Sequence, residues 1–163
     1  MNDPTSERGS VRLRNHWKRP LGPLGYYWFL TFEASPELRS LVKHCQDSID
    51  FPFYDPTPPD SLHLTIDRIA PVGEISTDQL DSTISSAIRA CRGESAFELG
   101  IDQLSVVPSA VSLNVSPAHA VHHLRDTLRS ATLSACPELQ LGHPKPHPPH
   151  ISIAYANSMA HQR

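Results

Sequence analysis

Two short segments of the sequence place a hydroxyl side chain two positions after a histidine. They are residues 63–66 (HLTI) and 150–153 (HISI). Alternate side chains of a β-strand share a face, so each segment would present an imidazole and a hydroxyl above an apolar underside. Histidine gives and takes protons near neutral pH. Two imidazoles on opposite sides of a phosphorus atom could therefore act as base and acid, with the hydroxyls donating to the non-bridging oxygens.

The elements that must position these segments follow from the hydrophobic pattern. Aromatic, β-branched and alternating stretches predict strands, and apolar residues three and four positions apart predict helices. The expected strands cover 25–33, 63–69, 97–107, 110–115 and 150–155, and the expected helices cover 36–49, 76–92 and 117–135. The mixture of strands and helices predicts an α+β fold.

A strand, a helix, a proline-rich loop and a histidine-led strand occur in that order twice, at 25–69 and at 110–155. Each helix is expected to begin at a Ser-Pro pair, Ser35-Pro36 or Ser116-Pro117. We interpret the pattern as a degenerate internal duplication, although strand–helix–strand units also recur by chance. Duplicated halves with their equivalent strands side by side would place the two histidines across one cleft.

The paired H-x-T/S motifs, each opening a strand of a repeated unit, resemble the two-histidine (2H) phosphoesterase superfamily. The most similar branch is the 2′-5′ RNA ligase-like proteins, also called RNA 2′,3′-cyclic phosphodiesterases, and the resemblance covers about 26–156. It implies two pseudo-symmetric lobes of antiparallel-rich sheet, with outer helices, around a central cleft. It also implies catalytic roles for His63, Thr65, His150 and Ser152. The second motif has serine where threonine is usual, and this serine still supplies a hydroxyl.

The resemblance implies a phosphoric diester hydrolase that opens a 2′,3′-cyclic phosphate, or a related phosphodiester, without a metal or other cofactor. The expected partner is an RNA end or a small nucleotide carrying a cyclic phosphate or a 2′-5′ linkage. Enzymes with the same residues acting on other substrates, such as cyclic ADP-ribose phosphates, stay open as an alternative. So does a nucleotide- or RNA-binding module without turnover. A third alternative is a metal-dependent hydrolase that uses the histidines of the loop at 143–150.

Three further residues are candidates for binding the substrate. Lys145 and Arg68 could hold a phosphate or a nucleotide backbone. Strand alternation places Arg68, five residues after His63, on the opposite face, which counts against direct contact unless the strand has ended. Tyr54, in a loop before the first motif, could stack on a base. Tyr26, Tyr27 and Trp28 in the first strand could also stack on a base. The aromatic residues of this strand and Tyr155 are nevertheless expected to pack in the core.

Composition and charge indicate the domain organisation, the class of partner and the cellular location. The 163 residues suit one domain at 21–163, preceded by a basic arm at 1–20. The arm could touch nucleic acid, but its five positive charges are few, and it is expected to be solvated and disordered. The net charge of −3 argues against a general nucleic-acid binder. Three separated cysteines, no secretory signal and no apolar run of about 20 residues predict a cytoplasmic protein that does not cross a membrane. We expect it to be a monomer.

Overall fold

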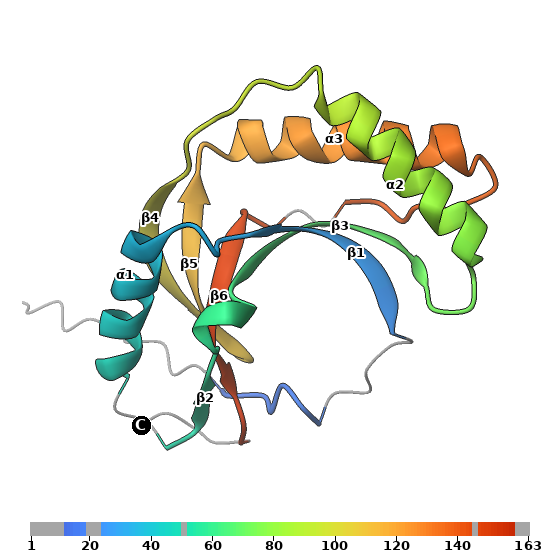
Figure 1. The fold of residues 1–163 in the computed structure, drawn as a ribbon. Helices are drawn as coiled ribbons and strands as arrows, with labels where there is room; N and C mark the ends of the chain where they lie inside the picture. Colours follow the sequence, from blue (N-terminus) through green and yellow to red (C-terminus); the bar gives the residue numbers. More distant parts are fainter. Residues whose placement is uncertain (1–11, 19–23, 50–51, 145–146, 159–163) are drawn as a thin grey trace, which may run out of the picture.

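A computed structural model describes residues 12–18, 24–49, 52–144 and 147–158 of the chain. This part contains three α-helices and a six-stranded antiparallel sheet, so the expected α+β class is confirmed (Figure 1). The strands are β1 (Gly25–Thr31), β2 (Tyr54–Pro56), β3 (His63–Pro71), β4 (Gly100–Val107), β5 (Ala110–Ser116) and β6 (His150–Ala156). The helices are α1 (Pro36–Asp47), α2 (Thr77–Cys91) and α3 (Ala118–Ala135), and a short 3₁₀ turn covers Pro59–Ser61.

The two histidine-led strands are neighbours in the middle of the sheet. The strand order is β1-β3-β6-β5-β4, and β2 pairs with the far half of β6. Leu64 of β3 pairs with Ile151 of β6, and both side chains are fully buried. These strands form one continuous sheet, so the strand pairing does not divide into the separate sheets expected of two lobes.

The helices begin where the sequence predicts. Pro36 occupies the first turn of α1. At α2, Ser76 accepts a hydrogen bond from the backbone N–H of Gln79, and the Gln79 side chain accepts one from Ser76 N–H, which forms a capping box. The third helix follows Pro117. The strand expected at 97–107 is shorter, since β4 begins only at Gly100.

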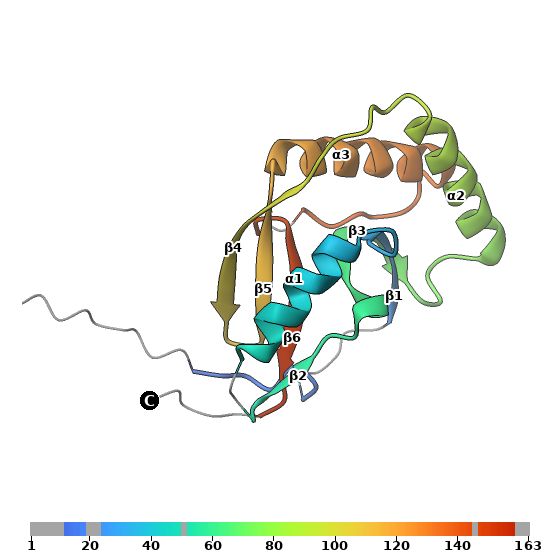
Figure 2. The same ribbon diagram turned by 60° about the vertical axis from the view of Figure 1, so that its left-hand side comes forward.

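Helices α1 and α3 pack on one face of the sheet, and α2 packs mainly against α3. Gln46 of α1 donates to the carbonyl oxygen of Ile153 in β6 at 2.8 Å, and Trp28 of β1 donates to the hydroxyl of Thr132 in α3 at 3.2 Å. Figure 2 shows α1 beside β5 and β6, while α3 runs from the end of β5 across the sheet toward α2. Apolar residues of α1, α3 and the central strands form one core on this side. None of the described helices is long and apolar enough to cross a membrane.

Residues 12–18 of the basic arm pack on the sheet. Leu13 is buried, with 1% of its surface exposed. The backbone N–H of His16 donates to the carbonyl oxygen of Ala156 at 2.7 Å. The expectation of a solvated arm therefore does not hold for this stretch, because Leu13 contributes an apolar side chain to the core.

Candidate active site

The pairing of β3 with β6 brings the two H-x-T/S motifs together on one face of the sheet. Because Leu64 pairs with Ile151 in antiparallel register, the flanking positions bring His63 to Ser152 and Thr65 to His150. Leu64 and Ile151 point into the core, so the four motif side chains lie on the opposite face. We call this the histidine face. Thr65 and His150 are exposed there, and His63 and Ser152 are half-buried.

Both histidines are held by the same kind of hydrogen bond. Nδ1 of His63 lies 2.8 Å from the carbonyl oxygen of Ser61, and Nδ1 of His150 lies 2.9 Å from that of Pro148. A carbonyl oxygen can only accept, so Nδ1 carries the proton in both rings. In the neutral ring Nε2 is then the acceptor nitrogen, and it is the atom left for proton transfer.

Neighbouring side chains support the motif residues from both sides. The hydroxyl oxygen of Ser152 lies 3.2 Å from that of buried Ser112 in β5. The ring of Phe29 in β1 meets the His63 imidazole edge to face, with 4.6 Å between the centroids. Such contacts restrict the rotation of the imidazole and of the Ser152 side chain, which favours a defined geometry for proton transfer.

A β-bulge follows each motif at the same position. In β3, Thr65 pairs with Phe29 and Asp67 pairs with Trp28, so Ile66 is the extra residue. In β6, Ser152 pairs with Ser112 and Ala154 pairs with Val111, so Ile153 is the extra residue. An extra residue in one strand reverses which of the following side chains lie on each face.

The first bulge brings Arg68 to the histidine face, contrary to the prediction from strict alternation. Arg68 pairs with Tyr27, and Tyr27 shares a face of β1 with Phe29. The guanidinium carbon of Arg68 lies 5.8 Å from the Tyr27 ring centroid, and the Tyr27 and Phe29 rings stack at 5.6 Å. Tyr27 is 38% exposed and Phe29 46% exposed, so the expectation of core packing was wrong for these two residues.

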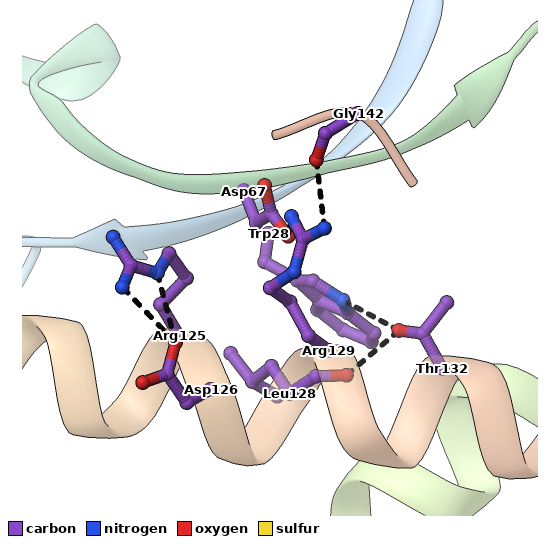
Figure 3. Close-up of polar contacts among 8 residues, drawn as sticks. All are labelled: Trp28, Asp67, Arg125, Asp126, Leu128, Arg129, Thr132 and Gly142. Carbon is purple, nitrogen blue, oxygen red and sulfur yellow. Dashed lines mark hydrogen bonds and ion pairs between the residues drawn. The ribbon is translucent and has the colours of Figure 1, made fainter. Parts of the chain in front are cut away.

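The same bulge turns Asp67 toward α3. Its carboxylate accepts from the guanidinium of Arg129 at 2.7 Å, and both side chains are largely buried. Arg129 also donates to the carbonyl oxygen of Gly142, in the loop that leads to His150 (Figure 3). One arginine of α3 therefore ties β3 to this loop.

The second bulge places Tyr155 on the histidine face, so the expectation that Tyr155 packs in the core was also wrong. Its ring lies 4.2 Å from the His16 ring and 5.6 Å from the Trp17 ring, measured between centroids. Tyr155 and Arg68 occupy equivalent positions, each five residues after a motif histidine. One end of the histidine face thus carries a cation with aromatic rings, and the other carries an aromatic cluster.

A cavity of about 570 Å³ adjoins the His150 side of this face. It is enclosed by β3, by the beginning of α3 and by the loop before His150. Its lining includes Tyr27, Thr65, Arg68, Arg125, His147 and His150. Arginine and histidine side chains outnumber the two acidic residues of the lining, Asp67 and Glu74. Asp67 is already paired with Arg129, and Arg125 is paired with Asp126. This environment suits an anionic group next to His150.

One of the predicted substrate-binding residues, Tyr54, lies away from this site. It belongs to strand β2 rather than to a loop, and it is 9% exposed and packs in the core. Tyr54 pairs with buried Ala156 of β6, and both residues belong to the core, which places Tyr54 on the helix-covered face. Burial raises the pKa of the Tyr54 hydroxyl. Another predicted binding residue, Lys145, lies outside the described residues.

In the described part of the chain, no three histidine, cysteine, aspartate or glutamate side chains come close enough together to hold a metal ion. His143 and His147 line the cavity together with His150, and the surrounding side chains include arginines.

The sequence reasoning assigned Tyr27 to the core, and it missed Phe29, Ser112 and the two carbonyl groups that hold the histidines. A signal for the aromatic pair was present, because Tyr27 and Phe29 alternate with Trp28 and therefore share one face of a strand. The carbonyl groups of Ser61 and Pro148 carry no such signal, since every residue has one.

The family comparison matches residues 33–163 to the 2′-5′ RNA ligase superfamily. A comparison with curated proteins found no significant match. Among solved structures, the protein TT0787 of Thermus thermophilus is 22% identical, with a TM-score of 0.64 over 82% of this chain and 75% of that chain. Escherichia coli LigT in its apo form is 19% identical, with a TM-score of 0.59 over 85% and 76%. LigT complexed with 3′-AMP is 18% identical, with a TM-score of 0.57 over the same shares.

Proposed function

The chain belongs to the 2′-5′ RNA ligase superfamily, and we propose that it is a metal-independent phosphoesterase of the 2H type. Its substrate is a 2′,3′-cyclic phosphate or a related phosphodiester of RNA or of a nucleotide. The observation that carries the proposal is the shared arrangement of His63 and His150, both fixed through Nδ1 and both beside a hydroxyl residue on one face. The complex of LigT with 3′-AMP supports a nucleotide as the ligand.

In the proposed reaction the two imidazoles act on opposite sides of the phosphorus atom. Nε2 of one neutral histidine takes a proton from water as the water oxygen bonds to phosphorus. Nε2 of the other, protonated histidine gives its proton to the ribose oxygen as the bond from phosphorus to that oxygen breaks. The products are a phosphate monoester and a free ribose hydroxyl. The reverse protonation pattern would serve the reverse reaction.

Three side chains are proposed to stabilise the charge that develops on the phosphate. Thr65 and Ser152 donate hydrogen bonds to the non-bridging oxygens. Arg68, brought to the same face by the bulge, adds a permanent positive charge beside them. No step of this scheme requires a metal ion.

Two features of the sheet support an internal duplication. The bulge follows the hydroxyl residue by one position in both β3 and β6. Each motif histidine also donates to the carbonyl oxygen two residues before it. We interpret β3 and β6 as equivalent strands of two related halves, with the substrate between them. Neither feature is a general property of antiparallel strands, so chance recurrence explains them poorly.

The test is turnover of a nucleoside 2′,3′-cyclic phosphate in excess EDTA, from pH 5 to pH 9. We expect His63→Ala and His150→Ala each to lower kcat by about 10²- to 10⁴-fold. Exposed His44 on α1 supplies the matched control, and His44→Ala is expected to keep wild-type activity. The profile of the wild type is expected to be bell-shaped, because one imidazole must be neutral and the other protonated.

Each contrary result identifies a different alternative. Full turnover in either motif variant contradicts the two-histidine mechanism. Activity that EDTA abolishes and zinc restores indicates a metal-dependent hydrolase. Tight binding of the cyclic nucleotide without product, in the wild type, indicates a binding module.

A further inference from the structure

Trp17 is an exposed indole that the protein holds in a fixed position. It is 54% exposed. Its Nε1 donates to a carboxylate oxygen of Asp55 at 2.8 Å, and its backbone N–H donates to the side-chain oxygen of Asn15 at 2.9 Å. The other oxygen of Asp55 accepts from the side chain of Asn157 at 2.8 Å, and the Asn15 amide donates to the Asn157 carbonyl oxygen. One hydrogen-bonded network thus links Trp17 with Asp55, Asn157 and Asn15.

The indole is part of an aromatic cluster on the histidine face. The Trp17 ring meets both His16 and Tyr155 at steep angles, with centroids 4.9 and 5.6 Å away. Tyr155 is three residues beyond Ser152 in β6, which corresponds to about 10 Å along the strand. A stretch of one or two nucleotides could therefore span the distance from the motif hydroxyls to the cluster. The cluster lies at the end of the face opposite Arg68.

Anchoring of the arm does not explain an exposed indole. Leu13 already anchors residues 12–18 in the core, and backbone hydrogen bonds hold Arg14 and His16. Single-stranded nucleic acid is recognised by aromatic rings on which bases stack, next to cations that follow the backbone. Lys18, exposed and adjacent to Trp17, supplies such a cation. A rigid indole also loses little conformational entropy when a base stacks on it.

We propose that Trp17, His16 and Tyr155 form a subsite for a nucleobase next to the scissile phosphate. This inference rests on the proposed function and extends it, because the preferred substrate is then a single-stranded RNA chain rather than a mononucleotide. The residues of the arm lie outside the segment that matches the family, which begins at residue 33. Tyr155 lies inside that segment, so the subsite combines two residues of the arm with one residue of β6.

Tryptophan fluorescence tests the subsite without any turnover. The chain has two tryptophans, so Trp28→Phe leaves Trp17 as the only one. In a His63→Ala, Trp28→Phe protein, a short single-stranded RNA ending in a 2′,3′-cyclic phosphate is expected to quench Trp17 fluorescence on titration. The corresponding cyclic mononucleotide is expected to bind with little quenching. Circular dichroism of the Trp28→Phe protein checks that it is folded.

A kinetic comparison of the two substrates provides the second readout. Trp17→Ala is expected to raise KM for the RNA roughly 5- to 100-fold, the range that one lost base–aromatic stack implies. KM for the cyclic mononucleotide is expected to stay within about twofold, and Trp17→Phe is expected to retain part of the RNA preference. Leu104→Ala, at an exposed apolar residue of β4, is the matched control and should change neither KM.

The outcomes separate the subsite from the activity. Absence of quenching by the RNA, or equal effects of Trp17→Ala on both substrates, overturns the subsite. Quenching by RNA in a protein that turns over neither substrate supports the subsite while contradicting the proposed enzymatic function.

Discussion

His63 and His150 each donate Nδ1–H to the backbone carbonyl oxygen two residues earlier, Ser61 in one case and Pro148 in the other. The two imidazoles therefore keep the same nitrogen, Nε2, for proton transfer. This orientation is set by the main chain on the N-terminal side of each strand, and it is identical in the two motifs although the preceding segments differ. One is a 3₁₀ turn and the other is a pair of prolines.

The first prediction concerns the tautomers of these rings. Above about pH 8, where histidine in peptides is neutral, both rings are expected to be Nδ1–H tautomers because a carbonyl oxygen accepts at Nδ1. Two-bond ¹H–¹⁵N correlation NMR distinguishes the tautomers, with exposed His44 as the reference ring. Nε2–H tautomers at His63 and His150 would contradict the arrangement.

The second prediction concerns Arg68. Arg68→Ala is expected to lower kcat/KM for a cyclic phosphate about 10- to 100-fold, as for the loss of a hydrogen bond to a charged group. Arg68→Lys should retain only part of the wild-type kcat/KM, because an ammonium group lacks the planar pair of donors. Steady-state kinetics on Arg92→Ala, at the exposed end of α2, provides the control. Unchanged kinetics in Arg68→Ala would show that the bulge does not bring this side chain to the substrate.

The third prediction concerns the ion pair between Asp67 and Arg129. Both side chains are largely buried, so Asp67→Asn leaves a buried guanidinium without its partner and should lower the free energy of unfolding by about 3 kcal/mol. Urea denaturation measures this change. Asp67→Leu combined with Arg129→Met is expected to recover part of the loss, because both buried charges are then removed.

A matched control for this ion pair lies on the surface of α1. Lys43 and Asp47 form an exposed pair, and Asp47→Ala should change the free energy of unfolding by less than about 1 kcal/mol. Equal destabilisation by Asp67→Asn and Asp47→Ala would mean that the buried pair contributes no more than a surface pair.

The fourth prediction concerns stability at alkaline pH. Burial raises the pKa of Tyr54 in the folded protein above its unfolded value of about 10. The neutral hydroxyl therefore contributes stability that is fully present below the unfolded pKa and is lost as pH rises through the folded pKa. Urea denaturation from about pH 8 to about pH 11 should show a smaller decline in Tyr54→Phe than in the wild type. Parallel declines in the two proteins would count against this assignment.

The sequence by itself determined the two motifs, the helix starts and the face that each strand presents up to Thr65 and Ser152. These features depend on local properties: a proline or capping residue sets the beginning of a helix, and the alternation of a strand sets the faces of neighbouring side chains. The buried positions of Leu64 and Ile151 follow from the same alternation, and so does the shared face of each histidine and its hydroxyl partner.

Only the tertiary structure decided where Arg68, Tyr155, Asp67 and Tyr54 lie. The two bulges depend on how β3 pairs with β1 and how β6 pairs with β5, and no glycine marks either position in the sequence. Tyr54 is buried because β2 adds to the far half of β6, a pairing between segments about 100 residues apart. Alternation is a property of a single strand, whereas register belongs to a pair of strands. The residues that complete the site were therefore set by the partner strands.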